Sequence, residues 1–109
     1  MKIIFISGAY RAKDWEGIEA NIQHAKQAAI KLWKEGWAVI CPHLNTAHFE
    51  GCPDNVWLEG GLEILRRCDA IYMLKDWRKS EGAVKEFWGA MSGGLDVYFE
   101  EDAEGVLVG

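Results

Sequence analysis

Four short apolar runs divide the chain and limit the folds that are open to it. KIIFIS begins at residue 2, WAVIC at residue 37, DAIYML at residue 69 and DVYF at residue 96. Continuous apolar runs of this length are typical of strands that are buried on both faces. Such strands occur almost only in parallel sheets that carry helices on each side. We therefore predict a strand at each run.

Segments with helical spacing separate these strands. Apolar residues recur every three or four positions from Ile18 onward, and Gly36 should end this first helix. A second helix is expected at VWLEGGLEILRRC, capped by Asp54 or Asn55, and a third follows the cap residue Ser80. The connecting segments are predicted to be loops or turns: GAYRAKDWEG, PHLNTAHFEGCPDN and KDWRK.

Strands that alternate with helices form βαβ units, which require parallel strands and right-handed crossovers. We therefore expect an α/β fold, a three-layer sandwich of flavodoxin-like or Rossmann-like type. Its parallel sheet should have four to five strands with helices on both faces, and VLVG at residues 106–109 is the optional fifth strand. With 109 residues and no linker or repeat, residues 1–109 should form a single domain.

Charge and hydropathy argue against several classes of partner. The formal net charge is −5 and no run of Lys or Arg is present, whereas nucleic-acid backbones and anionic membranes are bound by concentrated basic surfaces. No apolar stretch approaches the ~20 residues of a membrane-spanning helix, and no signal-peptide pattern follows Met1. We expect a cytoplasmic protein whose partner is a small molecule, with no nucleic acid and no membrane.

Ligands bind at the carboxyl ends of the strands in sheets of this kind. In the loop KDWRKSEGA, Ser80 is the expected helix cap, and Gly82 lies in the first turn, where glycine costs about 1 kcal/mol relative to alanine. Glycine allows a ligand to approach the backbone closely, so a phosphate could bind the free N–H groups there. Glu86 lies one turn further on the same face. It is either a solvated surface acid or a group aimed at the ligand.

The other loops at this edge add further candidates. In SGAYR, Gly8 and Tyr10 belong to a turn that could bind a phosphate, with Arg11 supplying positive charge. This turn is neither GxGxxG nor a P-loop, so an ordinary βα turn is the alternative. His43 follows the second strand and should line the pocket. Asp76 follows the third strand and is a candidate pocket acid.

Two further residue types bear on metals and assembly. Cysteines and histidines gather in CPHLNTAHFEGC, but their spacing matches no standard zinc motif, so we expect no metal. The three cysteines of the chain are an odd number without paired spacing, which argues against a disulfide framework. Six tryptophans are many for this length. Use in the core and at a subunit interface would explain them, so we predict a homodimer or larger homo-oligomer.

The sequence resembles the nucleoside 2-deoxyribosyltransferase superfamily over residues 1–99. The segments ISGAYR, ICPHLNTAHF and LEILRRCDAIYML carry the resemblance, and its most specific part is CDAIYML followed by S-x-G-x-x-x-E. Within the superfamily the sequence looks most like a small branch of bacterial and phage proteins with a domain of unknown function. The deoxynucleoside 5′-monophosphate N-hydrolases lie near this branch.

The resemblance implies a flavodoxin-like fold and cleavage or transfer at an N-glycosidic bond, with no metal or organic cofactor. It also implies that the Glu86 carboxylate is the nucleophile. In this chemistry a carboxylate beneath the sugar ring stabilises the developing charge at C1′ or bonds to it, as in retaining glycosidases. Substrate-binding roles are implied at the matching positions Gly8, Arg11, His43, Ser80 and Gly82.

The sequence departs from these relatives at two positions. Gly61 stands where the catalytic members usually have an aspartate, so the usual proton donor is missing. Three nearby acids could replace it: Glu59, Glu63 and Asp76. Ala9 stands where the monophosphate hydrolases carry a serine, which weakens the case for a 5′-phosphate. Two functions stay open: N-glycosidic hydrolysis or deoxyribosyl transfer through Glu86, or a non-catalytic nucleotide-binding or sensing module that has lost its acid.

Overall fold

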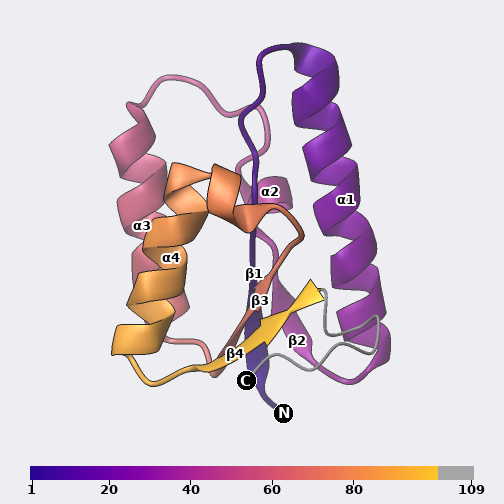
Figure 1. Ribbon diagram of the computed structural model, residues 1–109, viewed down its shortest axis with the longest axis vertical. Helices are drawn as coiled ribbons and strands as arrows, with labels where there is room; N and C mark the ends of the chain where they lie inside the picture. The colour runs from indigo at the N-terminus through magenta and orange to yellow at the C-terminus, as the bar shows by residue number, and fades with distance from the viewer. Residues whose placement is uncertain (101–109) are drawn as a thin grey trace.

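A four-stranded parallel sheet forms the centre of the protein in the computed structural model, which describes residues 1–100 (Figure 1). The strands are β1 (Ile3–Ser7), β2 (Ala38–Ile40), β3 (Ala70–Met73) and β4 (Asp96–Phe99). Their order is β2-β1-β3-β4, as in the first four strands of a flavodoxin-like sheet. The expected α/β fold is therefore confirmed. The optional fifth strand at residues 106–109 lies outside the described residues.

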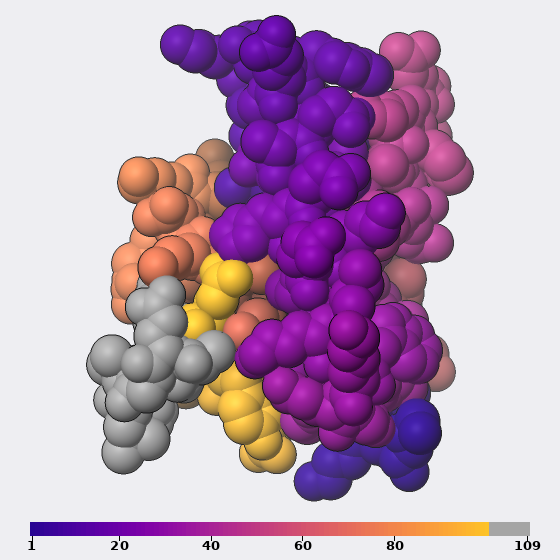
Figure 2. Space-filling model, turned by 90° about the vertical axis from the view of Figure 1, so that its right-hand side faces the viewer, coloured from indigo at the N-terminus to yellow at the C-terminus, as the bar shows by residue number. Residues whose placement is uncertain are grey.

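Helices cover both faces of this sheet and give the predicted three layers. α1 (Trp15–Lys34) packs on one face, and α3 (Asp54–Arg66) and α4 (Glu81–Ser92) pack on the other. Figure 2 shows α1 lying along the side of the molecule that faces the viewer. The other helical segments within residues 1–100 are α2 (Pro42–Asn45) and the 3₁₀ turn η1 (Trp77–Lys79). No helix in this part of the chain is long and apolar enough to cross a membrane.

Alternation along β1 divides the core between the two faces. Ile4 and Ile6 belong to the buried cluster beneath α1. Phe5 belongs to the second cluster, with residues of α3 and α4. Because side chains alternate along a strand, Ser7 points to the same face as Phe5. Pairing with β3 places Ser7 opposite Met73, at the carboxyl end of both strands.

The first helix begins one turn earlier than predicted. α1 starts at Trp15 and not at Ile18, because the Asp14 side chain accepts a hydrogen bond from the Gly17 N–H and caps the helix. The apolar pattern could not reveal this turn, since Trp15 and its neighbours in the first turn do not contribute to the buried core.

Two further segments differ from the prediction. α3 begins at Asp54 itself, preceded by Pro53, so neither Asp54 nor Asn55 is the cap residue. Within the long loop expected after β2, Pro42 begins the short helix α2. Proline suits this first helical position because its fixed φ is already helical. Its lack of an N–H costs no hydrogen bond there, since the first N–H groups of a helix have no partner within the helix.

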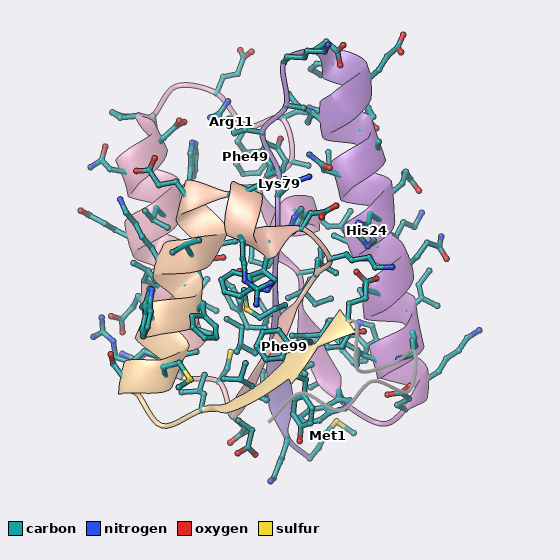
Figure 3. All side chains as sticks on the ribbon, viewed as in Figure 1. Met1, Arg11, His24, Phe49, Lys79 and Phe99 are labelled. Atoms are coloured by element: carbon teal, nitrogen blue, oxygen red, sulfur yellow. The ribbon has the colours of Figure 1, made fainter. Side chains whose placement is uncertain are left out.

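The loops that follow β1, β2 and β3 meet at one end of the molecule, as expected. Figure 3 shows one residue from each loop at that end: Arg11, Phe49 and Lys79. At the opposite edge, the Asp69 carboxylate accepts a hydrogen bond from the Ile3 N–H at 2.8 Å. Asp69 therefore joins β1 to the start of β3 and has a structural role.

Candidate active site

A hydrogen bond between two distant parts of the chain defines the candidate site. The Ser7 hydroxyl at the end of β1 lies 2.6 Å from Oε1 of Glu86 in α4. Ser7 is 1% exposed, and Glu86 is partly buried. Glu86 is therefore directed at the carboxyl edge of the sheet and is not a solvated surface acid.

Burial changes the acidity of Glu86. Loss of contact with water raises the pKa of the Glu86 carboxyl group from 4.5 to about 7, because burial disfavours the charged form. The hydrogen bond from Ser7 lowers this pKa, because it stabilises the ionised carboxylate, but its effect is the smaller of the two. Near neutral pH both forms of Glu86 are populated, which is the range where catalytic acids and bases work.

The second oxygen of Glu86 faces α3. A Cβ atom placed on Gly61 would lie 3.6 Å from Glu86 Oε2. Among residues 1–100, the hydrogen-bond partner of Glu86 is Ser7, which meets Oε1, and no hydrogen bond reaches Oε2. One oxygen of Glu86 is thus held by Ser7, and the other faces the glycine of α3.

The start of α4 has the structure that the sequence predicts. The Ser80 hydroxyl accepts a hydrogen bond from the Ala83 N–H at 3.1 Å and caps the helix. Gly82 faces α3, where its absent Cβ would lie 3.9 Å from Cδ1 of Leu58. Gly82 and Glu86 therefore share the side of α4 that looks onto α3. Ligand binding at Ser80 and Gly82 stays a prediction.

The two other candidates of the first loop have structural partners. A Cβ on Gly8 would lie 2.7 Å from the Leu74 side chain, so glycine is needed here for close packing against the end of β3. The Arg11 guanidinium pairs with the Asp54 carboxylate at the start of α3, and both side chains are mostly exposed. Arg11 therefore ties the first loop to α3, and its partner in the structure is Asp54 and not Glu86.

His43 joins the first two loops from the inside. Its Nε2 donates to the Ala9 carbonyl oxygen at 3.0 Å, and its ring meets the Tyr10 ring edge to face with centroids 6.1 Å apart. Tyr10 in turn accepts a hydrogen bond from the backbone N–H of His48 at 3.0 Å. The His43 side chain is buried, and burial lowers the pKa of its imidazole. His43 is thus a neutral residue at pH 7 that fixes the shape of the loops.

We expect His43 to make stability depend on pH. Its pKa in the folded protein lies below the ordinary value of about 6.5, so the unfolded chain binds more protons near that pH. The free energy of unfolding should therefore decrease as the pH falls below about 6.5. Denaturant titrations at pH 8 and pH 5 measure this, in a Glu86→Gln background that removes the opposite contribution of Glu86. His43→Gln should weaken the decrease, and an equal decrease in both proteins would contradict this role.

The acids that could replace the missing aspartate are engaged or exposed elsewhere. Glu63 pairs with the two arginines at the end of α3. Asp76 is exposed, lies 3.8 Å from the Lys79 ammonium group and has a left-handed backbone with φ of 65°. Glu59 is exposed on α3. No contact brings any of these carboxylates to Glu86 in the part of the chain that the structure describes.

Ser7 is the site residue that the sequence analysis missed. In the sequence it is only the first residue of the SGAYR turn. One signal was present: a polar residue ends an apolar strand, on the face that Phe5 shares with α3 and α4. Sequence position alone could not show that α4 brings a carboxylate to this hydroxyl.

Other features of the described residues lie away from Glu86. A cavity of about 230 Å³ opens on the α1 face of the sheet, and its lining includes Leu32, Trp37, Tyr72 and Tyr98. Within residues 1–100, no group of three or more side chains comes together that could hold a metal ion. The cysteines there are free thiols.

Comparisons with known proteins agree with this architecture. The family model Domain of unknown function (DUF4406) matches residues 4–99. A 2-desoxiribosyltransferase from Leishmania mexicana is similar in structure, with a TM-score of 0.63 and 18% sequence identity. The match covers 91% of this chain and 63% of that one, so the chain spans less than two thirds of that protein's length. At this identity the likeness concerns the fold. No curated protein matched the sequence.

Proposed function

Since the chain belongs to the DUF4406 family, whose description assigns no activity, we propose its function from the site: it breaks the N-glycosidic bond of a nucleoside or nucleotide, by hydrolysis or deoxyribosyl transfer. The observation that carries this proposal is the Glu86 carboxylate, which Ser7 holds at one oxygen and which has only a glycine beside the other. Its pKa of about 7 and its place at the carboxyl edge of a parallel sheet support the same function.

The reaction would follow the path of a retaining glycosidase. Glu86 forms a bond to C1′ of the sugar while the C1′–N bond breaks. The electron pair of the C1′–N bond goes to the base nitrogen, which takes a proton from water. In hydrolysis a second water adds to C1′, and the bond between C1′ and Glu86 breaks with its electrons returning to the carboxylate. The proton released by this second water neutralises the hydroxide that the first step left. In transfer, a nitrogen of another base takes the place of this second water.

The substrate would lie over the loops that meet at this edge. Ser80 and Gly82 at the start of α4 offer backbone N–H groups and the positive end of the helix dipole to a phosphate or a sugar hydroxyl. Gly8, Tyr10 and Arg11 flank the sugar in the same proposal, and His43 supports their loop from below. Arg11 would have to exchange Asp54 for the ligand, which is inexpensive for an exposed ion pair.

Base release from a panel of substrates tests this function. Purified protein is incubated with deoxynucleosides and with their 5′-monophosphates, and free base is separated by chromatography. We expect release from at least one member of the panel, slowly, because general acid catalysis worth about 10²–10⁴-fold is missing. A preference for monophosphates over nucleosides would assign the start of α4 to the phosphate. No release from any member, with measurable binding, would exclude the enzyme.

A nucleotide-binding or sensing module without catalysis is the second candidate. Gly61 favours it, because the neighbour of Glu86 on α3 has no side chain and so cannot donate a proton. The same panel distinguishes the two functions. Binding measured by calorimetry without base release is the result expected of the module.

We also propose a homodimer that uses the outer side of α4. Trp88 is 61% exposed and Met91 is 50% exposed, and their spacing places them together on that side. Light scattering at micromolar concentration should give the mass of a dimer. Trp88→Lys should give a monomer, whereas Trp15→Lys is the matched control because Trp15 is 63% exposed on α1. A monomer mass for the wild type would refute the dimer.

A further inference from the structure

We propose that Ser7 is a positioning residue for the reaction: it fixes Oε1 of Glu86, so that Oε2 is the oxygen that bonds to the substrate carbon. This inference rests on the proposed function. It names which oxygen reacts and which residue selects it, and it follows from the contacts of Ser7 and Glu86 alone.

The Ser7 hydroxyl is held in one place. Ser7 is the last residue of β1 and is 1% exposed, and its carbonyl oxygen accepts a hydrogen bond from the Leu74 N–H at 2.8 Å. Next to it, Gly8 packs so closely on Leu74 that no Cβ would fit. A buried strand end with this packing cannot turn its hydroxyl toward solvent. Its short hydrogen bond to Glu86 is therefore built into the sheet.

The two oxygens of Glu86 then differ in what they can do. Oε1 accepts a hydrogen bond from Ser7 at 2.6 Å, while Oε2 lies beside Gly61 and accepts none from residues 1–100. A substrate carbon can therefore approach Oε2 without breaking the contact to Ser7. After Oε2 has bonded to C1′ and the base has left with the C1′–N electron pair, Oε1 is the carbonyl oxygen of the ester and can keep the same hydrogen bond. When water cleaves the ester, the electrons return to the carboxylate.

Ser7 also favours the reactive form of the carboxylate. Only ionised Glu86 can bond to carbon, and a donated hydrogen bond stabilises the ionised form over the protonated one. Burial acts in the opposite direction on this carboxyl group. Removing the hydroxyl should therefore release Oε1 and keep Glu86 protonated over a wider pH range.

A direct titration tests this without any turnover. Carbon NMR of labelled Glu side chains in Ser7→Ala should show the pKa of Glu86 higher than in the wild type by about one pH unit or more, the equivalent of a hydrogen bond to a charged group. Ser7→Thr keeps a hydroxyl and should return the pKa toward the wild-type value. Ser92→Ala, at the exposed end of α4, is the control and should change nothing. Thermal unfolding of each variant verifies that it is folded.

The pH dependence of base release supplies the second measurement. In Ser7→Ala the acidic limb of the kcat profile should move upward with the pKa of Glu86, with about a 10-fold loss at pH 7 that shrinks at pH 9 and little change in KM. An unshifted pKa and an unshifted profile in folded Ser7→Ala would overturn the positioning role. A shifted pKa in protein whose wild type releases no base would overturn the proposed function instead, and leave Ser7 as a structural partner of Glu86.

Discussion

Glu86→Gln is expected to reduce base release by about 10³-fold or more while nucleotide binding is retained. The amide has nearly the same shape as the carboxyl group and can still accept a hydrogen bond from Ser7, but it cannot bond to C1′ as a nucleophile. Chromatography of released base and calorimetry of nucleotide binding give the two readouts. Glu81→Gln is the matched control, since Glu81 lies on the same helix in an exposed pair with Lys85. Base release at the wild-type rate would contradict the role of Glu86.

The same substitution should stabilise the protein at alkaline pH. Because the pKa of Glu86 is raised from 4.5 to about 7 by burial, folding is favoured by a protonated Glu86 below pH 4.5, and this contribution is lost as the pH rises through 7. One pH unit of pKa corresponds to about 1.4 kcal/mol, so ionising Glu86 costs on the order of 3 kcal/mol. Denaturant titrations at pH 9 should show Glu86→Gln more stable than the wild type by up to that amount. A less stable variant at pH 9 would show that the charge is well solvated.

Gly61→Asp is expected to increase the rate of base release by up to about 10²–10⁴-fold, the usual size of general acid catalysis. The new Cβ would lie 3.6 Å from Glu86 Oε2, so the two carboxyl groups would be close neighbours. Two carboxyl groups at such a distance cannot both ionise easily, and one keeps its proton at neutral pH. The pair would then hold an ionised nucleophile and a proton donor for the departing base.

Two neighbouring variants separate this effect from a general stabilisation of α3. Gly60→Asp also replaces a glycine inside the helix, but a side chain there meets nothing within 4 Å and points in another direction. The side chain introduced by Gly61→Asn has nearly the shape of the aspartate, but its amide cannot act as a general acid. Both should leave the rate close to that of the wild type. Equal acceleration by all three variants would mean that helix stability, and not proton donation, limits the rate.

Local signals in the sequence were sufficient to predict most elements of the fold. The apolar runs and the helix between Ser80 and Gly93 follow from periodicity and caps, which act over a few residues. The start of α1 was missed because its cap, Asp14, lies outside the apolar pattern. Glu86 could be singled out because it lies one turn beyond Gly82. The position of the site at the carboxyl edge followed from the sheet topology.

The contacts between side chains within the candidate site could not be predicted from such local signals. Which side chain meets which depends on how α3 and α4 pack on the sheet, and the sequence holds no periodic signal for that. The ion pair of Arg11 with Asp54 and the contact of Gly61 with Glu86 both depend on this packing. The bond from His43 to the Ala9 carbonyl depends on how α2 meets the first loop.

The bond between Ser7 and Glu86 spans 79 positions of the chain. It joins β1 to α4, so β1, β3 and α4 must all be in place before the carboxylate reaches its partner. Contacts of such long range form late, because closing the loop between the two residues costs entropy, and this cost is compensated only when the sheet is assembled. The acidity of Glu86 is therefore a probe of tertiary assembly. A chain that has formed its helices but has not docked α4 on the sheet would carry Glu86 in water, as an ordinary carboxylate.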